Sequence, residues 1–455
     1  MLFGIFLARR LTKGDYGILA VISVFTLVAG CIQAAGFSQA LANMKKPTHN
    51  DYNAVFWFNI LAGLVLYGIL FLCAPLIAQF FHQPVLVDVS RLTFLAIPIS
   101  ALGIVPNANL WINLRTRELA ISNFFALMVS GCTGIWLAYH GYAYWSLVWQ
   151  QIIHIIVANI IKYYYTRWLP TTPIDFSPIG RMYKFSIKIL FTNILNTVNQ
   201  NVLTFIFGRI FHIDTVGVYN QANKWNTTGS SFISNTINQV AQPVLTAVND
   251  DAQREQRVFR KMTRFTAFLT FPAMFGLAMV AHEFIVITIT DYWLSCVPLL
   301  QILSIGGAFL PFYILHQNMA ISHGRSDLYL YCTIGQIIVQ LGIILLFSHW
   351  GITTMVIAYS IFTILYLLVW QLVTAPLSHI TIWQSLKDIL PFLIIAACCM
   401  GGTYVATRSI TNMPLLLAVR IIVAASLYFL VLRLLHAEIL NECLEFAKNK
   451  IKKNK

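Results

Sequence analysis

A stripe of polar residues follows one face of the segment 216–245, which is long enough to cross a membrane as a helix. Neighbouring members of the stripe are three or four residues apart, a spacing that places them on one side of a helix. Lipid cannot satisfy such groups, so the stripe must face protein or a water-filled cavity. Hydrogen bonding between helices needs fewer polar groups than this, which favours a hydrophilic cavity. The stripe consists of Asn220, Lys224, Thr227, Ser231, Asn235, Asn238 and Gln242.

Lys224 is the most informative member of the stripe. An ammonium group two turns into a membrane span costs on the order of 3 kcal/mol. No Asp or Glu lies within residues 216–245 to offset this cost. Two interpretations remain open: the ammonium meets an anionic ligand such as a diphosphate, or the side chain snorkels to the outer interface.

The preceding segment, 183–211, carries a broader and less regular polar surface that includes Asn199 and Asn201. Together the two segments predict a substrate cavity between helices. The opposite face of the second segment, around Phe232, is expected to point away from this cavity. The predicted cavity residues are Asn193, Asn196, Gln200, Asn220, Lys224, Ser231 and Asn235.

Five further charged residues are candidates for function. Arg9 and Arg209 occupy matched positions at the outer ends of two spans. They either contact lipid headgroups or the other lobe, or form a cationic outer vestibule. Arg115 and Arg117 end a span on the cytoplasmic side, where they either signal topology or are the first to meet a lipid diphosphate. Glu283, the most deeply placed carboxylate, either binds a coupling proton or sodium ion or pairs with a neighbouring helix.

Motifs typical of enzymes are missing from the sequence. There is no G-x-S-x-G, H-E-x-x-H, D-x-D or P-loop pattern, and no Cys or His spacing typical of a metal site. The isolated His140, His154 and His282 are expected to be interfacial or packed, and the eight cysteines to be small packing residues. We therefore expect no catalytic residues, no metal and no cofactor.

Composition places these residues in membrane helices. The chain has 455 residues, of which 58% are hydrophobic and only 10% charged, and its mean hydropathy is +0.72. Apolar stretches of about 20 residues each suffice to cross a bilayer. The predicted spans are 16–39, 52–78, 86–107, 119–139, 142–165, 183–211, 216–245, 263–289, 297–322, 328–349, 352–376, 389–407 and 414–436.

The net charge of +14 reflects membrane topology rather than nucleic-acid binding. If the 44–51 loop is cytoplasmic and the spans alternate, most of the 30 Lys and Arg residues fall on the cytoplasmic side. This positive-inside bias places the C-terminus in the cytoplasm. The basic tail 437–455 is expected to lie on anionic lipid.

A sparse repeat suggests two homologous lobes. Ala8-Arg9-x-Leu11-x4-Tyr16-Gly17 is echoed 200 residues later by Gly208-Arg209-x-Phe211-x4-Val216-Gly217. Two weaker echoes lie at offsets close to this one, and internal repeats around a central site are typical of transporters. The second copy ends a full span, so the short stub before Arg9 is expected to be the end of a first helix that lacks its beginning. The predicted organisation is an N-lobe (1–165), a cytoplasmic linker (166–182), a C-lobe (183–376), two additional helices (377–436) and the basic tail (437–455).

The residues at several of these positions resemble the Wzx-type polysaccharide and O-antigen (lipopolysaccharide) exporters of the multidrug/oligosaccharidyl-lipid/polysaccharide flippase superfamily. The first segment, Ala8-Arg9-x-Leu11-x3-Asp15-Tyr16-Gly17, resembles the end of the first helix in these flippases. The likeness continues in order to about residue 436. Its further segments are 36–41, 74–81, 141–148, 208–209, 217–219 and 242–245.

The resemblance implies an all-α polytopic membrane protein, a MATE-like two-lobe helical bundle with 13 to 14 transmembrane helices. It implies alternating access that moves an undecaprenyl-diphosphate-linked oligosaccharide across the bacterial inner membrane. Membrane lipids, a polysaccharide polymerase and a chain-length regulator are the other partners it suggests. Asn201 stands where many relatives have an acidic residue, so the sequence does not support an ion site there.

Two other functions were compared with a flippase. A multidrug or ion antiporter of the same superfamily would need an embedded carboxylate for cationic drugs, and the N-lobe spans carry none. A membrane polysaccharide polymerase or ligase would need a long external loop with Arg or His clusters, and the predicted external loops are short.

Overall fold

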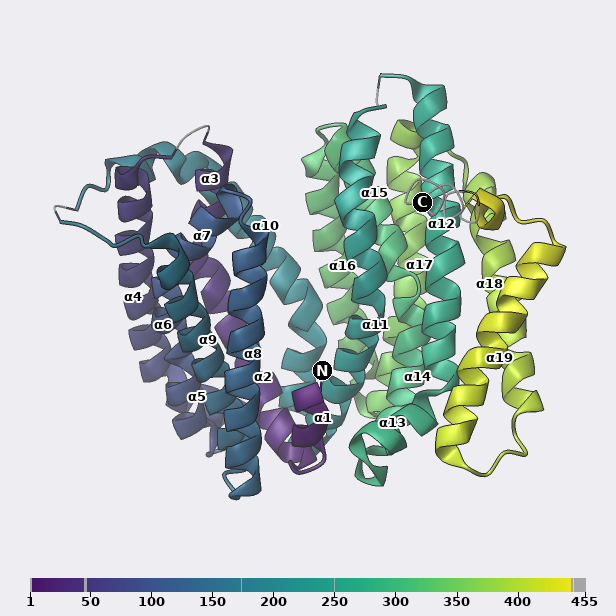
Figure 1. Cartoon of the computed structure of the whole chain (residues 1–455), viewed down its shortest axis with the longest axis horizontal. Coiled ribbons are helices and arrows are strands. Elements are labelled where there is room, and N and C mark those ends of the chain that lie inside the picture. Colours follow the sequence, from purple (N-terminus) through teal and green to yellow (C-terminus); the bar gives the residue numbers. More distant parts are fainter. Residues whose placement is uncertain (1, 45–46, 173, 249, 443–444, 446–455) are drawn as a thin grey trace, which may run out of the picture. The chain divides into compact units, whose positions relative to one another are not determined.

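The computed structural model shows a helical chain (Figure 1). It describes residues 2–44, 47–172, 174–248, 250–442 and 445. The chain forms two compact units, Met1–Asn220 and Gln221–Lys455, and the boundary falls inside helix α11 (Ile213–Thr246).

The first unit contains ten helices and the start of α11 within its described residues. These helices are α1 (Leu2–Ala8), α2 (Lys13–Ala34), α3 (Phe37–Asn43), α4 (His49–Phe81), α5 (Leu86–Phe94), α6 (Ala96–Leu102), α7 (Ile104–Ile112), α8 (Thr116–Tyr139), α9 (Tyr144–Thr166) and α10 (Ser177–Ile210).

Local sequence signals explain where the long helices of this unit begin and break. Capping boxes formed by Thr12 with Asp15, and by Thr48 with Asp51, satisfy the free backbone N–H groups at the starts of α2 and α4. The α5–α7 segment bends by 44° at Gly103. A side chain at Gly103 would collide with the Asn159 amide of α9, which donates a hydrogen bond to the Ile99 carbonyl at 2.8 Å.

The linker between α9 and α10 folds back onto the start of α4. Asn53 bonds to both the N–H and the carbonyl of Thr171, and Asn50 donates to Asp175 at 2.9 Å. Hydrogen bonds from the N–H and hydroxyl of Ser177 and from Asn50 lower the pKa of Asp175. The predicted cytoplasmic linker is therefore held to the first unit by side-chain hydrogen bonds.

Helix α10 packs against α2, α3 and α4, so it belongs to the first unit rather than to the second half of the chain. Gly36 allows this approach, because a side chain there would lie 2.8 Å from the Ser186 carbonyl oxygen of α10. Further along, the rings of Phe25, Phe81 and Phe205 meet at centroid distances of 5.6–6.1 Å. The predicted organisation, with a linker at 166–182, places this helix in the C-lobe, and that division into lobes stays a prediction.

The starts of α2 and α11 meet through two glycines. A side chain on Gly17 would lie 2.0 Å from the Ile213 carbonyl oxygen, and one on Gly217 would lie 1.9 Å from that of Lys13. These residues are paired by the repeat offset of 200. The contact is therefore reciprocal: the two copies of the sequence repeat contact each other through equivalent residues, as in a local twofold arrangement.

The second unit contains the rest of α11 and the helices that follow. They are α12 (Ala252–Met279), α13 (Ala281–Ile289), η1 (Asp291–Trp293), α14 (Cys296–Gly307), α15 (Leu310–Ser322), α16 (Ser326–Phe347), η2 (Ser348–Trp350), α17 (Ile352–Ser378), α18 (Ile382–Ala406) and α19 (Met413–Leu434). The core between them is rich in aromatic residues, among them Phe271, Phe312, Tyr366, Trp370 and Tyr428.

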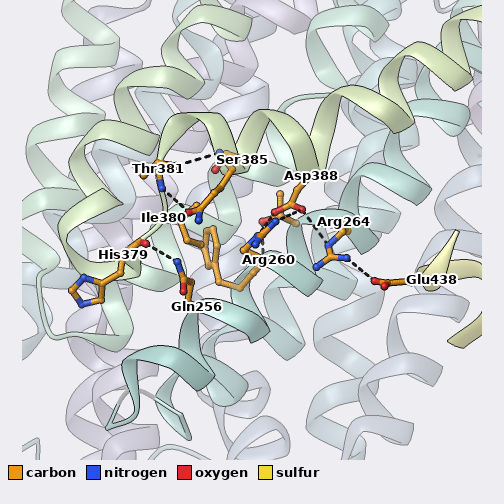
Figure 2. Close-up of polar contacts among 12 residues, drawn as sticks. Gln256, Arg260, Arg264, His379, Ile380, Thr381, Ser385, Asp388 and Glu438 are labelled. Carbon is orange, nitrogen blue, oxygen red and sulfur yellow. Dashed lines mark hydrogen bonds and ion pairs between the residues drawn. The ribbon is translucent and has the colours of Figure 1, made fainter.

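A charged network fixes α12 to α18 in this unit (Figure 2). Asp388 of α18 is buried and accepts two hydrogen bonds from Arg260, at 2.7 and 3.0 Å. Arg264, one turn further along α12, lies 3.3 Å from Asp388 and 2.9 Å from Glu438. The network thus also holds the segment that follows α19.

This segment is the described beginning of the predicted basic tail. Ile439 and Leu440 are buried in the second unit, and Lys261 forms an ion pair with Glu442 at 2.9 Å. Residues 443–444 and 446–455 of the predicted tail lie outside the described residues. The first residues of the tail therefore pack on protein, because they alternate apolar anchors with carboxylates that pair with α12.

Nine helical spans in the described residues are long and apolar enough to cross a membrane, and eleven if each of two bent helix pairs counts as one span. The bent pairs are α5–α7 and α12–α13, the latter bent by 65°. The thirteen spans expected from sequence also include α10 and α11. Each of these has 34 residues, enough to cross, but both carry many amide and charged side chains.

Candidate functional site

The polar stripe of α11 lies on the surface of the second unit. Lys224, Thr227, Asn235, Asn238 and Gln242 are exposed there. Ser231 is partly buried, as is Asn220, which belongs to the first unit. A stripe that served as hydrogen-bond glue within the unit would be buried, whereas this one faces outward.

The packed face of α11 lies on another side of the helix and combines apolar residues with the buried Gln221, Asn226 and Ser230. Trp225, Ile237, Ala241 and Leu245 are at most 7% exposed and pack against the second unit. Phe232, expected on the face opposite the stripe, is 72% exposed and therefore lies beside the stripe rather than on the packed face. The helix thus buries one side and presents polar and apolar strips on the other.

Most hydroxyl groups near the stripe are satisfied by the helix itself. Thr227, Thr228 and Ser231 donate to carbonyl oxygens three or four residues earlier, at 2.7–3.1 Å. Such bonds are common for Ser and Thr in helices and leave these groups little need for a ligand. Asn238 accepts from Asn318 of α15 at 3.2 Å.

Lys224 and Asn235 differ from these residues. Within the described part of residues 221–455, no hydrogen bond or ion pair holds the Lys224 ammonium or the Asn235 amide. A cation and an amide separated by three turns of one exposed face are able to bind an anionic or sugar-like group. They are two members of the stripe with free binding capacity.

On α10 the predicted cavity residues sit at the edge of the first unit. Gln200 is exposed, while Asn193 and Asn196 are partly buried. Nearby, Cys31 of α2 lies 3.2 Å from the Thr197 hydroxyl, so this side of α10 faces α2. Gln200 is therefore the α10 residue best placed to meet a ligand.

The two matched arginines have different surroundings. Arg209 donates to His82 Nδ1 at 2.9 Å, and its guanidinium lies over the Phe80 ring at 5.2 Å. It therefore docks onto the end of α4. Arg9 is exposed at the end of α1, next to Arg10, whose guanidinium lies 5.3 Å from the Tyr139 ring centre.

Arg115 and Arg117 are likewise not equivalent. Arg115 forms an ion pair with Glu118 at 2.9 Å and donates to the Tyr165 carbonyl of α9 at 3.2 Å. Arg117 is exposed at the start of α8. Arg115 thus has a structural role between α8 and α9, and Arg117 is the one available to lipid.

Glu283 forms a buried ion pair. Its Oε1 lies 2.7 Å from Nη1 of Arg420 on α19, and both residues are at most 5% exposed. Arg420 also donates to the Thr407 hydroxyl at 3.1 Å and lies over the Tyr404 ring at 4.5 Å. Pairing of Glu283 with a neighbouring helix was one of the two predicted roles, but the sequence did not identify Arg420 as the partner. The signal was an arginine inside an otherwise apolar span.

Comparison with known proteins identifies the family. Residues 6–298 match the family described as "Polysaccharide biosynthesis protein". The chain belongs to this family. It is the Wzx-type branch of the multidrug/oligosaccharidyl-lipid/polysaccharide superfamily, a family of membrane transporters rather than of enzymes.

Individual relatives are distant. The chain is 26% identical over 317 residues to an uncharacterized membrane protein in the cps region of Klebsiella pneumoniae, covering 67% of this chain and 63% of that protein. It is 24% identical to the teichuronic acid biosynthesis protein TuaB of Bacillus subtilis, covering 82% and 78%. It is 23% identical to the lipopolysaccharide biosynthesis protein WzxC of Escherichia coli, covering 66% and 62%.

Solved structures establish the fold. A lipid II flippase MurJ in an inward closed conformation superposes with a TM-score of 0.75 at 14% identity, over 95% of this chain and 97% of that one. An inward-facing MATE-family multidrug transporter gives a TM-score of 0.67, over 83% and 94%. The protein is therefore an all-helical, multi-pass membrane protein with the MurJ/MATE fold.

Proposed function

We propose that this protein is a flippase that moves an undecaprenyl-diphosphate-linked oligosaccharide across the bacterial inner membrane. The observation that carries the proposal is Lys224, an exposed cation within a long helix whose neighbouring face is packed. The names of the relatives TuaB and WzxC, and the fold shared with a lipid II flippase, support a lipid-linked glycan as the cargo.

In this proposal the stripe of α11 and the exposed part of α10 each contact the polar head as it crosses. The Lys224 ammonium attracts the diphosphate, and amides such as Asn235 and Gln200 exchange hydrogen bonds with the sugars. Amides suit this role because each both donates and accepts, as sugar hydroxyls do. The lipid chain stays in the bilayer while the head crosses by alternating access.

The positive-inside distribution of charge gives the orientation. In the proposed orientation the linker 166–182, the segment between α11 and α12 and the C-terminus are cytoplasmic. The cargo enters from the cytoplasmic leaflet, where Arg117 is available to an anionic lipid head. It leaves on the periplasmic side, near Arg9 and Arg209.

Complementation of a deletion strain tests the proposal. The strain is expected to lose surface polysaccharide and to accumulate the undecaprenyl-linked intermediate, and the wild-type gene is expected to restore export. Lys224→Ala should lower export about tenfold or more, since a hydrogen bond to a charged group contributes about 1.5–3 kcal/mol. Lys224→Arg should retain part of the export.

Lys387→Ala is the matched control, because Lys387 is also exposed on a long helix but lies over the Trp383 ring on α18. It should export normally. All variants are compared at equal protein level in isolated membranes. Normal export by Lys224→Ala would show that the lysine only snorkels to the interface, and a deletion strain with normal surface polysaccharide would refute the function.

A further inference from the structure

A second polar site lies inside the first unit, away from the stripe of α11. It is a cavity of about 300 Å³ lined by α3, α6, α7, α8 and α9. This volume is at the lower end of small-molecule sites and far above the space one monatomic ion needs. Asn107 and Asn123, which line it, are exposed, so the cavity is open on that side.

Two groups of α9 supply its charge. His154 and Lys162 both line the cavity, with the small side chain of Ala158 between them. The three residues are four apart and therefore lie along one side of the helix. Side chains on a helix tilt toward its N-terminus, so Lys162 extends back toward His154.

Three other polar groups around this cavity have structural partners. Asn159 donates to the Ile99 carbonyl at 2.8 Å, and Ser100 donates to Gln33 at 3.1 Å. Tyr163 donates to the Leu102 carbonyl at 2.9 Å. In contrast, the Lys162 ammonium forms no hydrogen bond or ion pair with the described residues of the first unit. Lys162 is thus not used to hold the helices together.

No carboxylate is among the described residues that line the cavity. A cation that is partly buried and unpaired is unfavourable unless an anion joins it. The donors available are the three N–H bonds of an ammonium and the side-chain amides of Asn107 and Asn123, while the His154 imidazole is hydrogen-bonded to the backbone of Ala126. This set matches an anion with several oxygen atoms rather than a halide.

We propose that this cavity binds a phosphoryl group, with Lys162 as its main charge partner. The source is either the headgroup of an anionic membrane lipid or a soluble phosphate. Lys162 is four residues from the end of α9, roughly 6 Å along the axis, which places it near the membrane surface. The site is distinct from the proposed transport path, so its occupancy does not depend on the proposed function.

Ligand binding by the purified full-length protein tests this site. The unfolding temperature is measured in an uncharged detergent while inorganic pyrophosphate or short-chain phosphatidylglycerol is added. Sodium chloride at equal ionic strength and phosphatidylcholine serve as the neutral comparisons. A ligand that binds only the folded protein raises the unfolding temperature in a saturable way, which gives its Kd.

Lys162→Gln should weaken binding of the probe about tenfold or more, and Lys162→Arg should largely restore it. His154→Gln should weaken it less, and it serves as a second variant if Lys162→Gln does not fold. Lys387→Gln should bind as the wild type does. Binding of phosphatidylglycerol but not pyrophosphate would support the site and assign it to a lipid headgroup.

Two results would overturn the proposal. One is a wild-type protein whose unfolding temperature responds to neither probe beyond its neutral comparison. The other is a Lys162→Gln variant that binds as tightly as Lys387→Gln. Because the readout is binding, neither result bears on whether the protein exports polysaccharide.

Discussion

Glu283→Gln should destabilise the protein strongly, because it leaves the Arg420 guanidinium buried without a counter-charge. The two side chains are 7% and 4% exposed and 2.7 Å apart. Removing one partner of a buried ion pair costs about 3–5 kcal/mol. Thr407 and Tyr404 remain as partners of Arg420 and offset about 1 kcal/mol of this cost.

The expected net loss is therefore about 2–4 kcal/mol, a large part of the roughly 5–15 kcal/mol that stabilises a typical protein. The double variant Glu283→Gln, Arg420→Leu removes both charges together. It should be more stable than the sum of the two single variants, with an interaction energy of about 1–3 kcal/mol. Unfolding of the purified proteins by heat and by denaturant measures these differences.

Glu118→Gln is the control, because Glu118 pairs with Arg115 at a similar distance but both side chains are more exposed, at 22% and 39%. It should cost about 0–1 kcal/mol. If Glu283→Gln costs no more than Glu118→Gln, the reasoning from burial is wrong. A double variant that is stable and abundant but exports no polysaccharide would instead show that Glu283 acts in ion coupling, the alternative that the sequence left open.

Three other predictions concern different parts of the chain. Asp388→Asn should lower the free energy of unfolding by about 2 kcal/mol, because Arg260 and Arg264 lose their common partner but remain about 30% exposed. Asp327→Asn, at an exposed ion pair, should change it little. Gly17→Ala or Gly217→Ala should lower the level of folded protein in membranes several-fold. Gly30→Ala should be tolerated, because the added methyl group has no other atom within 4 Å. Equal protein levels for all three variants would contradict the close backbone contact. Cysteine at Asn235 or Gln200 should react with a membrane-impermeant polar thiol reagent and cysteine at Ala241 should not, and equal labelling would remove the case for an accessible stripe.

The stripe of α11 could be predicted from sequence because one helix carries all of it. A helix repeats every 3.6 residues, so residues that share a face reveal themselves by spacing alone. The exposure of Lys224 and Asn235 agrees with that pattern. The packed face of α11 was harder to predict. Spacing gives the angle of each residue around the helix, but it does not say which side the neighbouring helices cover. Phe232, expected on the face opposite the stripe, is nevertheless exposed.

Partners on different helices were harder to predict. The Glu283–Arg420 pair joins residues from α13 and α19, and the Asp388 network joins α12, α18 and the segment after α19. The cavity at Lys162 draws on five helices, and in the sequence His154 was only an isolated histidine. Each of these sites depends on tertiary contacts that no periodic pattern encodes. A charged residue inside an apolar span indicates that it needs a partner, but it does not identify which residue on another helix that partner is.

The sparse repeat is explained by the contact between α2 and α11. Each of these helices begins at a residue related to the other by 200 positions, Lys13 and Ile213, and each has a glycine four residues later. The carbonyl oxygen at the start of one helix lies where a side chain of the other glycine would be. Only glycine fits such an approach, whereas the neighbouring lipid- and protein-facing positions accept many residues. Two copies can therefore diverge almost everywhere and still keep this glycine, which accounts for a repeat that is weak in sequence yet reciprocal in structure.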